Sequence, residues 1–145
     1  MEIKLKIDKK LNENYCEIFI REMTPEISEM ITSIQNFDYK IIVNKDGSKY
    51  SINLDKIITL YSENKKILLK TDNNQIHSMY ETIKHLSQKL PYHFLRISNS
   101  EIINTNKISH FEFTFGGKIK IYFNNGDYTY SSRSYLIEIK RYFGL

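Results

Sequence analysis

Apolar and polar residues alternate near the start of the chain, and a helical spacing follows. Residues 2–7 alternate strictly, which is typical of a half-buried strand, and residues 15–20 repeat the pattern with Cys16 on the apolar face. Thr24-Pro25-Glu26 has the residue types of a helix start, because Thr can cap, Pro suits the first helical position and an acid suits the first turn. An apolar stripe at helical spacing follows, over Ile27, Met30, Ile31 and Ile34. The pattern predicts a β-β-α unit over residues 1–38, too small to stand alone.

Short strands dominate from residue 39 onward. Apolar runs bounded by polar turns predict strands over 39–43, 49–52, 54–61 and 67–69, with a further return at Ile76. The polar segment 62–66 is predicted to be a loop. A mid-chain helix, capped by Ser78 or a neighbour, is predicted from one apolar face made by Met79, Ile83, Leu86 and Leu90, and Pro91 ends it.

The last third of the chain combines a polar turn with a strand meander. A short strand ends at Ile97, the polar run 98–100 follows, and the apolar pair Ile102-Ile103 begins the next strand. Residues 111–130 alternate between glycine turns, and Ser131-Ser132 caps a last helix. Because short turns join most strands, the sheets should be antiparallel. The predicted fold is mainly β (α+β): small antiparallel sheets of about ten short strands with a mid-chain helix and a C-terminal helix, plus the N-terminal β-β-α extension.

Composition points to one globular, water-soluble unit of 145 residues, or one domain with a small addition, and we expect it in the cytoplasm. Hydrophobic residues make up 41% of the chain, and Cys16 is the single cysteine, so a disulfide framework within one chain is impossible. No apolar run approaches the ~20 residues of a membrane span. Residues 1–38 carry five basic against eight acidic residues, whereas 39–145 carry sixteen against nine. The basic remainder suits a polyanionic partner, and equally a solvated lysine-rich surface.

Catalytic and metal-binding patterns are not evident. The histidines have no second histidine or carboxylate at metal-ligand spacing; they are His77, His85, His93 and His110. No Gly-x-Ser-x-Gly motif is present, and the strand pattern makes Cys16 a core thiol. The glycine pairs fit hairpin turns rather than phosphate loops, because neither opens a helix after a strand. We therefore expect no enzyme, no metal and no cofactor.

Three polar segments between strands could contact a partner. Lys65 and Lys66 lie in one, the Ser98-Asn99-Ser100 run forms another, and Arg133 stands where the last strand meets the last helix. Asn can pair with adenine and Arg with guanine in a major groove, while Lys serves phosphates as a point charge. The alternatives are an ordinary turn at Asn99 and a salt bridge at Arg133, and local chemistry does not choose between them.

The segment Phe94-Leu95-Arg96-Ile97-Ser98-Asn99-Ser100-Glu101-Ile102-Ile103-Asn104-Thr105-Asn106-Lys107-Ile108 resembles the signature of the LytTR DNA-binding domain, a bacterial family. Further similarity lies in the 55–62 strand, in the turns at Gly116-Gly117 and Asn125-Gly126, and in the helix start at residues 131–135. Two departures are Tyr61, where the family often has Glu, and Ser132, where it often has Arg. The resemblance covers roughly residues 40–145, so the predicted domains are 1–38, for packing or dimerisation, and 39–145.

The resemblance implies a transcriptional regulator whose interstrand loops, rather than a recognition helix, enter successive major grooves of double-stranded DNA. Asn99 and Arg133 would then contact bases, Ser98 and Ser100 would flank Asn99, and Lys65 or Lys66 would lie in the first contacting loop. The layout resembles short stand-alone regulators, which implies a small membrane protein and a second copy as further partners. An alternative is a protein-interaction or ligand-sensing domain that uses its strand-borne tyrosines, among eleven in the chain, as a surface.

Overall fold

A computed structural model describes residues 4–12, 15–35 and 40–145. The helices are α1 (Pro25–Gln35), α2 (Ile83–Lys89) and α3 (Leu136–Phe143), with short 3-10 turns η1 (Leu54–Lys56), η2 (Thr105–Lys107) and η3 (Arg133–Tyr135). The strands are β1 (Ile41–Lys45), β2 (Ser48–Ile52), β3 (Ile57–Glu63), β4 (Lys66–Thr71), β5 (Ile76–Met79), β6 (Phe94–Ser98), β7 (Glu101–Asn104), β8 (Ile108–Phe113), β9 (Ile119–Phe123) and β10 (Tyr128–Tyr130).

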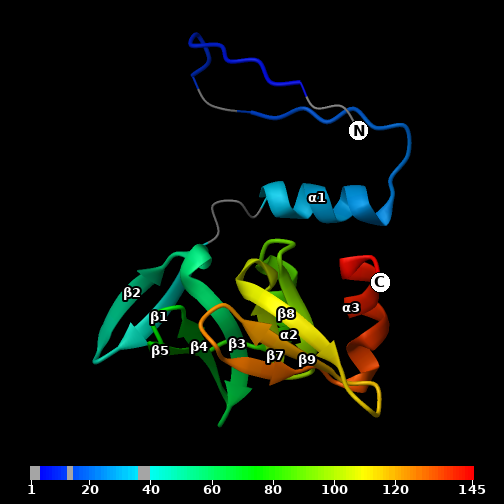
Figure 1. The fold of residues 1–145 in the computed structure, drawn as a ribbon. Coiled ribbons are helices and arrows are strands. Elements are labelled where there is room, and N and C mark those ends of the chain that lie inside the picture. Colours follow the sequence, from blue (N-terminus) through cyan, green and yellow to red (C-terminus); the bar gives the residue numbers. More distant parts are fainter. Residues whose placement is uncertain (1–3, 13–14, 36–39) are drawn as a thin grey trace.

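Two antiparallel sheets form the body of the molecule (Figure 1). The larger has seven strands in the order β2-β1-β5-β4-β3-β7-β6, and the smaller has three in the order β10-β9-β8. All pairings between described strands are antiparallel, as short turns require. The predicted mainly β fold of small antiparallel sheets is confirmed.

The apolar residues form two adjoining cores. One lies under α2, where Ile83 and Leu86 pack against large-sheet residues such as Leu60 and Ile102. The other lies between the sheets and α3, where Ile97 and Ile103 meet the three alternate inward residues of β9 and the helix residue Ile139. The meander and the inner face of the last helix, with Leu136, Ile139 and Phe143, are therefore as predicted.

Asn104, at the end of β7, is a buried polar residue of the larger sheet. Its side chain is 1% exposed, its Nδ2 donates to the carbonyl of Ile57 at 2.9 Å, and its Oδ1 accepts from the backbone of Asn106 at 3.0 Å. Because both ends of the amide are satisfied, Asn104 ties η2 and the end of β7 to the start of β3.

The predicted N-terminal strands are wrong over the residues that the structure describes. Residues 4–7 and 15–20 contain no strand, whereas α1 begins after Thr24 as predicted, with its hydroxyl accepting from the backbone of Ile27 at 3.3 Å. A strand needs a neighbour for its backbone groups, and no described strand pairs with this segment. Leu5 and Ile7 remain 88% and 82% exposed, and Cys16 is exposed rather than a core thiol. Figure 1 shows this segment running beyond α1, away from the sheets.

Two boundaries differ from the predicted ones. The mid-chain helix is capped by Thr82, whose hydroxyl accepts from the backbone of His85 at 3.1 Å, and Met79 belongs to β5. Pairing of Ser78 with Leu68 holds that segment in the sheet, which outweighs its helical spacing. The predicted loop over 62–66 is a tight hairpin, because β3 and β4 continue to a Glu63–Lys66 pair. No helix among the described residues is long and apolar enough to cross a membrane.

Candidate nucleic-acid interface

The first predicted contact segment is the tip of the β3–β4 hairpin. Asn64 and Lys65 occupy the turn with φ of 49° and 62°, the left-handed values that this hairpin type requires at both central residues. Asn tolerates that conformation well, while Lys is strained there. Lys65 and Lys66 are both exposed, and Lys66 Nζ lies 5.4 Å from the centre of the Tyr80 ring. The hairpin therefore presents two cationic side chains to solvent.

The second segment is the β6–β7 turn. Asn99 and Ser100 are exposed, and the Ser98 hydroxyl accepts from the backbone of Ser100 at 3.2 Å. Arg96 closes the turn from below: its Nε donates to the carbonyl of Ser98 and its Nη2 to the carbonyl of Asn99, both at 3.1 Å. The polar run is therefore a braced turn rather than a loose one.

The third segment lies at η3, between β10 and α3. The backbone of Ser132 donates to the carbonyl of Ile97 at 2.9 Å, which anchors η3 to the end of β6. Arg133 is exposed and lies over the β8–β9 turn, where a Cβ added to Gly116 would meet its Nη2 at 3.0 Å. Among the residues described, Arg133 has no ion-pair or hydrogen-bond partner, so the salt-bridge alternative is not what the structure shows.

These three turns, which we name the three corners, lie at one end of the larger sheet. The backbone of Ser62 donates to the carbonyl of Ser100 at 2.8 Å, which links the first corner to the second. The hydroxyl of Tyr135 donates to Oδ1 of Asn99 at 3.0 Å, which links the second to the third. No hydrogen bond joins Lys65 or Lys66 to Asn99 or Arg133 in the described parts of the chain. The lysines are held near the other two corners by the backbone pairing of the sheet and not by their own side chains.

Sequence reasoning did not single out Arg96, Tyr135 or Tyr80 as parts of this surface. Arg96 stands in the signature segment, but only its reach to two turn carbonyls shows its role. Tyr135 lies 36 residues from Asn99 in the chain, so spacing could not connect them. A signal was available for Tyr135, because an aromatic residue is a candidate for stacking on a cation. The cation that it meets is Arg96, from the signature segment.

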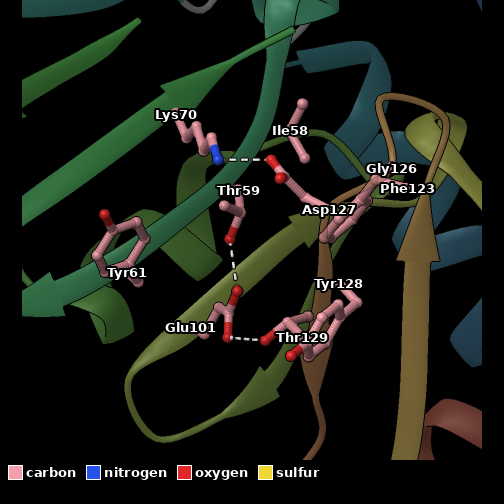
Figure 2. A pocket seen from close by; sticks show the side chains of 10 residues that line it. All are labelled: Ile58, Thr59, Tyr61, Lys70, Glu101, Phe123, Gly126, Asp127, Tyr128 and Thr129. Carbon is pink, nitrogen blue, oxygen red and sulfur yellow. Dashed lines mark hydrogen bonds and ion pairs between the residues drawn. The ribbon is translucent and has the colours of Figure 1, made fainter. Parts of the chain in front are cut away.

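A half-buried carboxylate, that of Glu101, lies directly behind the second corner. Glu101 Oε1 accepts from the Thr59 hydroxyl and Oε2 from the Thr129 hydroxyl, each at 2.7 Å, as Figure 2 shows. Burial raises the pKa of the Glu101 carboxyl, and the two hydroxyls partly oppose that rise. The side chain lines a cavity of about 320 Å³ between the two sheets, where the Lys70–Asp127 ion pair also lies. Both Glu101 oxygens are engaged, so its function here is to join the sheets.

The histidines lie in different environments in the described part of the chain. No group of three or more His, Cys, Asp or Glu side chains gathers there in a way that could hold a metal ion. Burial lowers the pKa of His77 and of His93, and His77 Nδ1 is buried without a hydrogen-bond partner. His85 lies on the exposed face of α2 and pairs with Glu81 at 2.7 Å.

Comparison with known proteins gives one consistent result. A family model described as the LytTr DNA-binding domain matches residues 47–144. An uncharacterized HTH-type transcriptional regulator of Staphylococcus aureus strain MSSA476 is 32% identical over 142 residues, which cover 97% of this chain and 96% of the relative. A regulator of the same description from strain MRSA252 is 31% identical over the same shares.

A solved structure agrees with the fold. It is the LytTr DNA-binding domain of a Bacillus cereus protein described as a methyl-accepting/DNA response regulator, with a TM-score of 0.69 and 18% identity, and it covers 73% of this chain and 97% of its own. Although the relatives are described as HTH-type, strands separate α1, α2 and α3 from one another here, so these helices form no helix-turn-helix pair. The chain belongs to the LytTr DNA-binding domain family.

Proposed function

We propose that this DNA-binding transcription regulator reads DNA with its three corners, without an inserted recognition helix. Asn99 and Arg133 contact base edges, Ser98 and Ser100 flank Asn99, and the hairpin carrying Lys65 and Lys66 supplies the adjacent contact. The observation that carries the proposal is the guanidinium of Arg133, which is exposed, has no ion-pair or hydrogen-bond partner among the described residues, and lies at the same end of the sheet as Asn99.

The chemistry of the corners matches the major groove. Arg pairs bidentately with O6 and N7 of guanine, and Asn can pair with N6 and N7 of adenine. Lysine ammonium groups suit phosphates as point charges, so Lys65 and Lys66 add affinity rather than sequence preference. Tight turns are narrow enough for a groove of about 12 Å. The excess of basic over acidic residues in 39–145, sixteen against nine, favours approach to the polyanion.

The decisive experiment selects bound duplexes from a random-sequence pool and then titrates the purified chain with a selected and a scrambled duplex. We expect at least about a thousandfold preference for the selected duplex, which is the lower end for specific DNA-binding proteins. Affinity should fall steeply with salt, because phosphate contacts release counterions. Equal affinity for both duplexes, or an affinity that does not change with salt concentration, would contradict the proposal.

A control variant tests the named residues. The double substitution of Asn99→Ala and Arg133→Ala should bring the selected duplex close to the scrambled one while the protein stays folded, since both side chains are exposed. A double variant that keeps its preference would show that other residues read the sequence. The proposed mechanism includes no catalytic step, and we place its action in the cytoplasm, where bacterial DNA is accessible.

Two further partners follow from the same layout. We propose that the N-terminal segment associates with a second copy, because Leu5, Ile7, Phe19 and Met23 are 88%, 82%, 90% and 63% exposed in one chain. Removing residues 1–24 should convert a dimer into a monomer, as judged by light scattering against the mass of the truncated chain, and a truncated chain that stays dimeric would remove this idea. Restraint by a small membrane protein is proposed from the resemblance, and co-expression followed by membrane fractionation tests it.

A tyrosine-rich binding surface remains a second candidate function. Lys120 Nζ lies 4.7 Å and 4.2 Å from the ring centres of Tyr122 and Tyr128 on the small sheet, and His110 stacks on Tyr122 at 4.4 Å. Such aromatic groups suit protein contacts. If this surface carries the function, substituting Tyr128→Ala should abolish regulation while leaving the preference for the selected duplex unchanged.

A further inference from the structure

We propose that Tyr135 and Arg96 are positioning residues that fix how Asn99 presents its amide to DNA, and so determine which base it accepts. The inference rests on the proposed function, because it requires that Asn99 reads a base. It goes further by naming the groups that hold Asn99 and the base class that results.

Arg96 fixes the backbone of the second corner. Its guanidinium donates to two successive turn carbonyls, those of Ser98 and Asn99, at 3.1 Å each. A planar fork that spans two acceptors holds their relative direction, which a single point charge cannot do. Arg96 is half-buried on β6, so the fork is anchored by the sheet. The turn that carries Asn99 is therefore rigid before DNA arrives.

Tyr135 fixes the side chain. Its hydroxyl donates to Asn99 Oδ1 at 3.0 Å, and its ring lies 5.7 Å from the Arg96 guanidinium carbon. The ring also packs against the core beneath η3, so its position is set by the fold and not by the turn. Arg96, Tyr135 and Asn99 thus form one unit in which the first two hold the third.

The direction of the hydrogen bond gives the amide a defined orientation. A tyrosine hydroxyl that donates to Oδ1 leaves both hydrogens of Asn99 Nδ2 without a partner among the described groups, and Oδ1 keeps one lone pair. Asn99 therefore offers a partner two donor hydrogens on Nδ2 but only one free acceptor lone pair on Oδ1. Purine N7 accepts from such a donor, and adenine N6 can donate to the remaining lone pair. Cytosine presents a donor in the major groove and is disfavoured.

Substitution of Tyr135→Phe is the direct test, because it removes the hydroxyl and keeps the ring. Without that hydroxyl the amide can rotate and accept from cytosine. We expect the affinity for the selected duplex to fall about three- to tenfold, the range for loss of one hydrogen bond. Discrimination against cytosine should weaken at one position only, and the salt slope should stay unchanged. In an Asn99→Ala background the same substitution should have no further effect.

Two controls separate positioning from stability or charge. Tyr50→Phe, on the exposed edge strand β2, should change neither base preference nor affinity. Arg96→Lys keeps the charge but loses the fork, so it should weaken the preference at the same position without changing the salt slope. In the free protein, the side-chain amide resonances of Asn99, assigned by their loss in Asn99→Ala, should shift in Tyr135→Phe.

The outcomes are distinguishable. If the wild-type chain prefers the selected duplex but Tyr135→Phe loses affinity equally on all sequences, or keeps its effect without Asn99, the positioning inference is overturned and the proposed function stands. If Arg96→Lys lowers the salt slope, Arg96 contacts phosphate instead. If the wild-type chain has no preference at all, the proposed function fails, and the inference fails with it.

Discussion

Thr129 donates its hydroxyl to Glu101 across 2.7 Å and so joins β10 of the small sheet to β7 of the large one. Thr59 engages the other carboxylate oxygen from β3, also at 2.7 Å. One carboxylate thereby couples the two sheets immediately behind the turn that carries Asn99. The coupling is sensitive to pH, because burial raises the pKa of the Glu101 carboxyl.

The substitution Glu101→Gln should flatten the dependence of stability on pH. A raised folded-state pKa means that the folded chain holds this proton more tightly than the unfolded chain. Its contribution to stability is therefore fully present below the unfolded pKa, near 4.3 for Glu, and is lost as pH rises through the folded pKa. Urea unfolding between pH 4 and pH 8 should show that loss in the wild type and a smaller one in Glu101→Gln. The exposed Glu112→Gln serves as control, and parallel profiles for all three proteins would contradict this account.

Substitution of Lys65→Gly should stabilise the fold and weaken DNA binding. Lys65 has φ of 62°, a conformation that costs a non-glycine residue about 1–2 kcal/mol, so removing that strain should raise the unfolding free energy by about 1 kcal/mol. Losing a phosphate contact should lower the salt slope by about one. Urea unfolding and salt-dependent titration measure the two effects. Lys66→Ala, at a strand position, should lower the slope without the gain in stability, and a salt slope unchanged in Lys65→Gly would place Lys65 away from DNA.

The variant Arg133→Ala should cost about 1–3 kcal/mol of binding free energy on the selected duplex and relax preference at one position. Arg133 is exposed and has no hydrogen-bond or ion-pair partner among the described residues, so the thermal midpoint should stay within error. Titration against duplexes with each base at every position measures the effect. A loss that is uniform over all duplexes would instead make Arg133 a phosphate contact.

The variant Gly116→Ala should disturb Arg133, and Gly126→Ala supplies a matched control. Both glycines have left-handed φ, 90° and 91°, so an added Cβ strains both turns alike. At Gly116 the new Cβ would lie 3.0 Å from Arg133 Nη2, whereas nothing lies within 4 Å at Gly126. We expect similar losses of unfolding free energy in urea, but a specific loss of affinity for Gly116→Ala alone, smaller than that of Arg133→Ala because the guanidinium can move. Equal affinities would show that the turn does not hold Arg133 in its reading position.

Local pattern was enough for most of the fold. Alternation between glycine turns predicts the meander that becomes β8 to β10, and Thr24-Pro25 predicts the start of α1. The apolar spacing predicts the helix over 83–89 but predicts a start near Ser78, whereas Thr82 caps the helix. Ser78 lies in a strand because its backbone pairs with Leu68, a contact that helical spacing cannot reveal.

The candidate site divides in the same way. The resemblance implies Lys65 or Lys66, Asn99 and Arg133 by position. The structure alone brings Tyr135 to Asn99 from 36 residues away. In the N-terminal segment a local pattern predicts an element that is not formed, since residues 4–7 have a strand pattern and form no strand. Alternation states which side chains share a face, but a strand exists only where another backbone pairs with it.

Local pattern is enough to predict the strand-rich body and to place polar residues at its turns, because both depend on neighbours a few positions apart. Only the folded chain shows that three of those turns share one end of a sheet, that Glu101 joins two sheets, and that Arg96 and Tyr135 contact Asn99. Those relationships depend on packing between distant segments, which no local periodicity encodes.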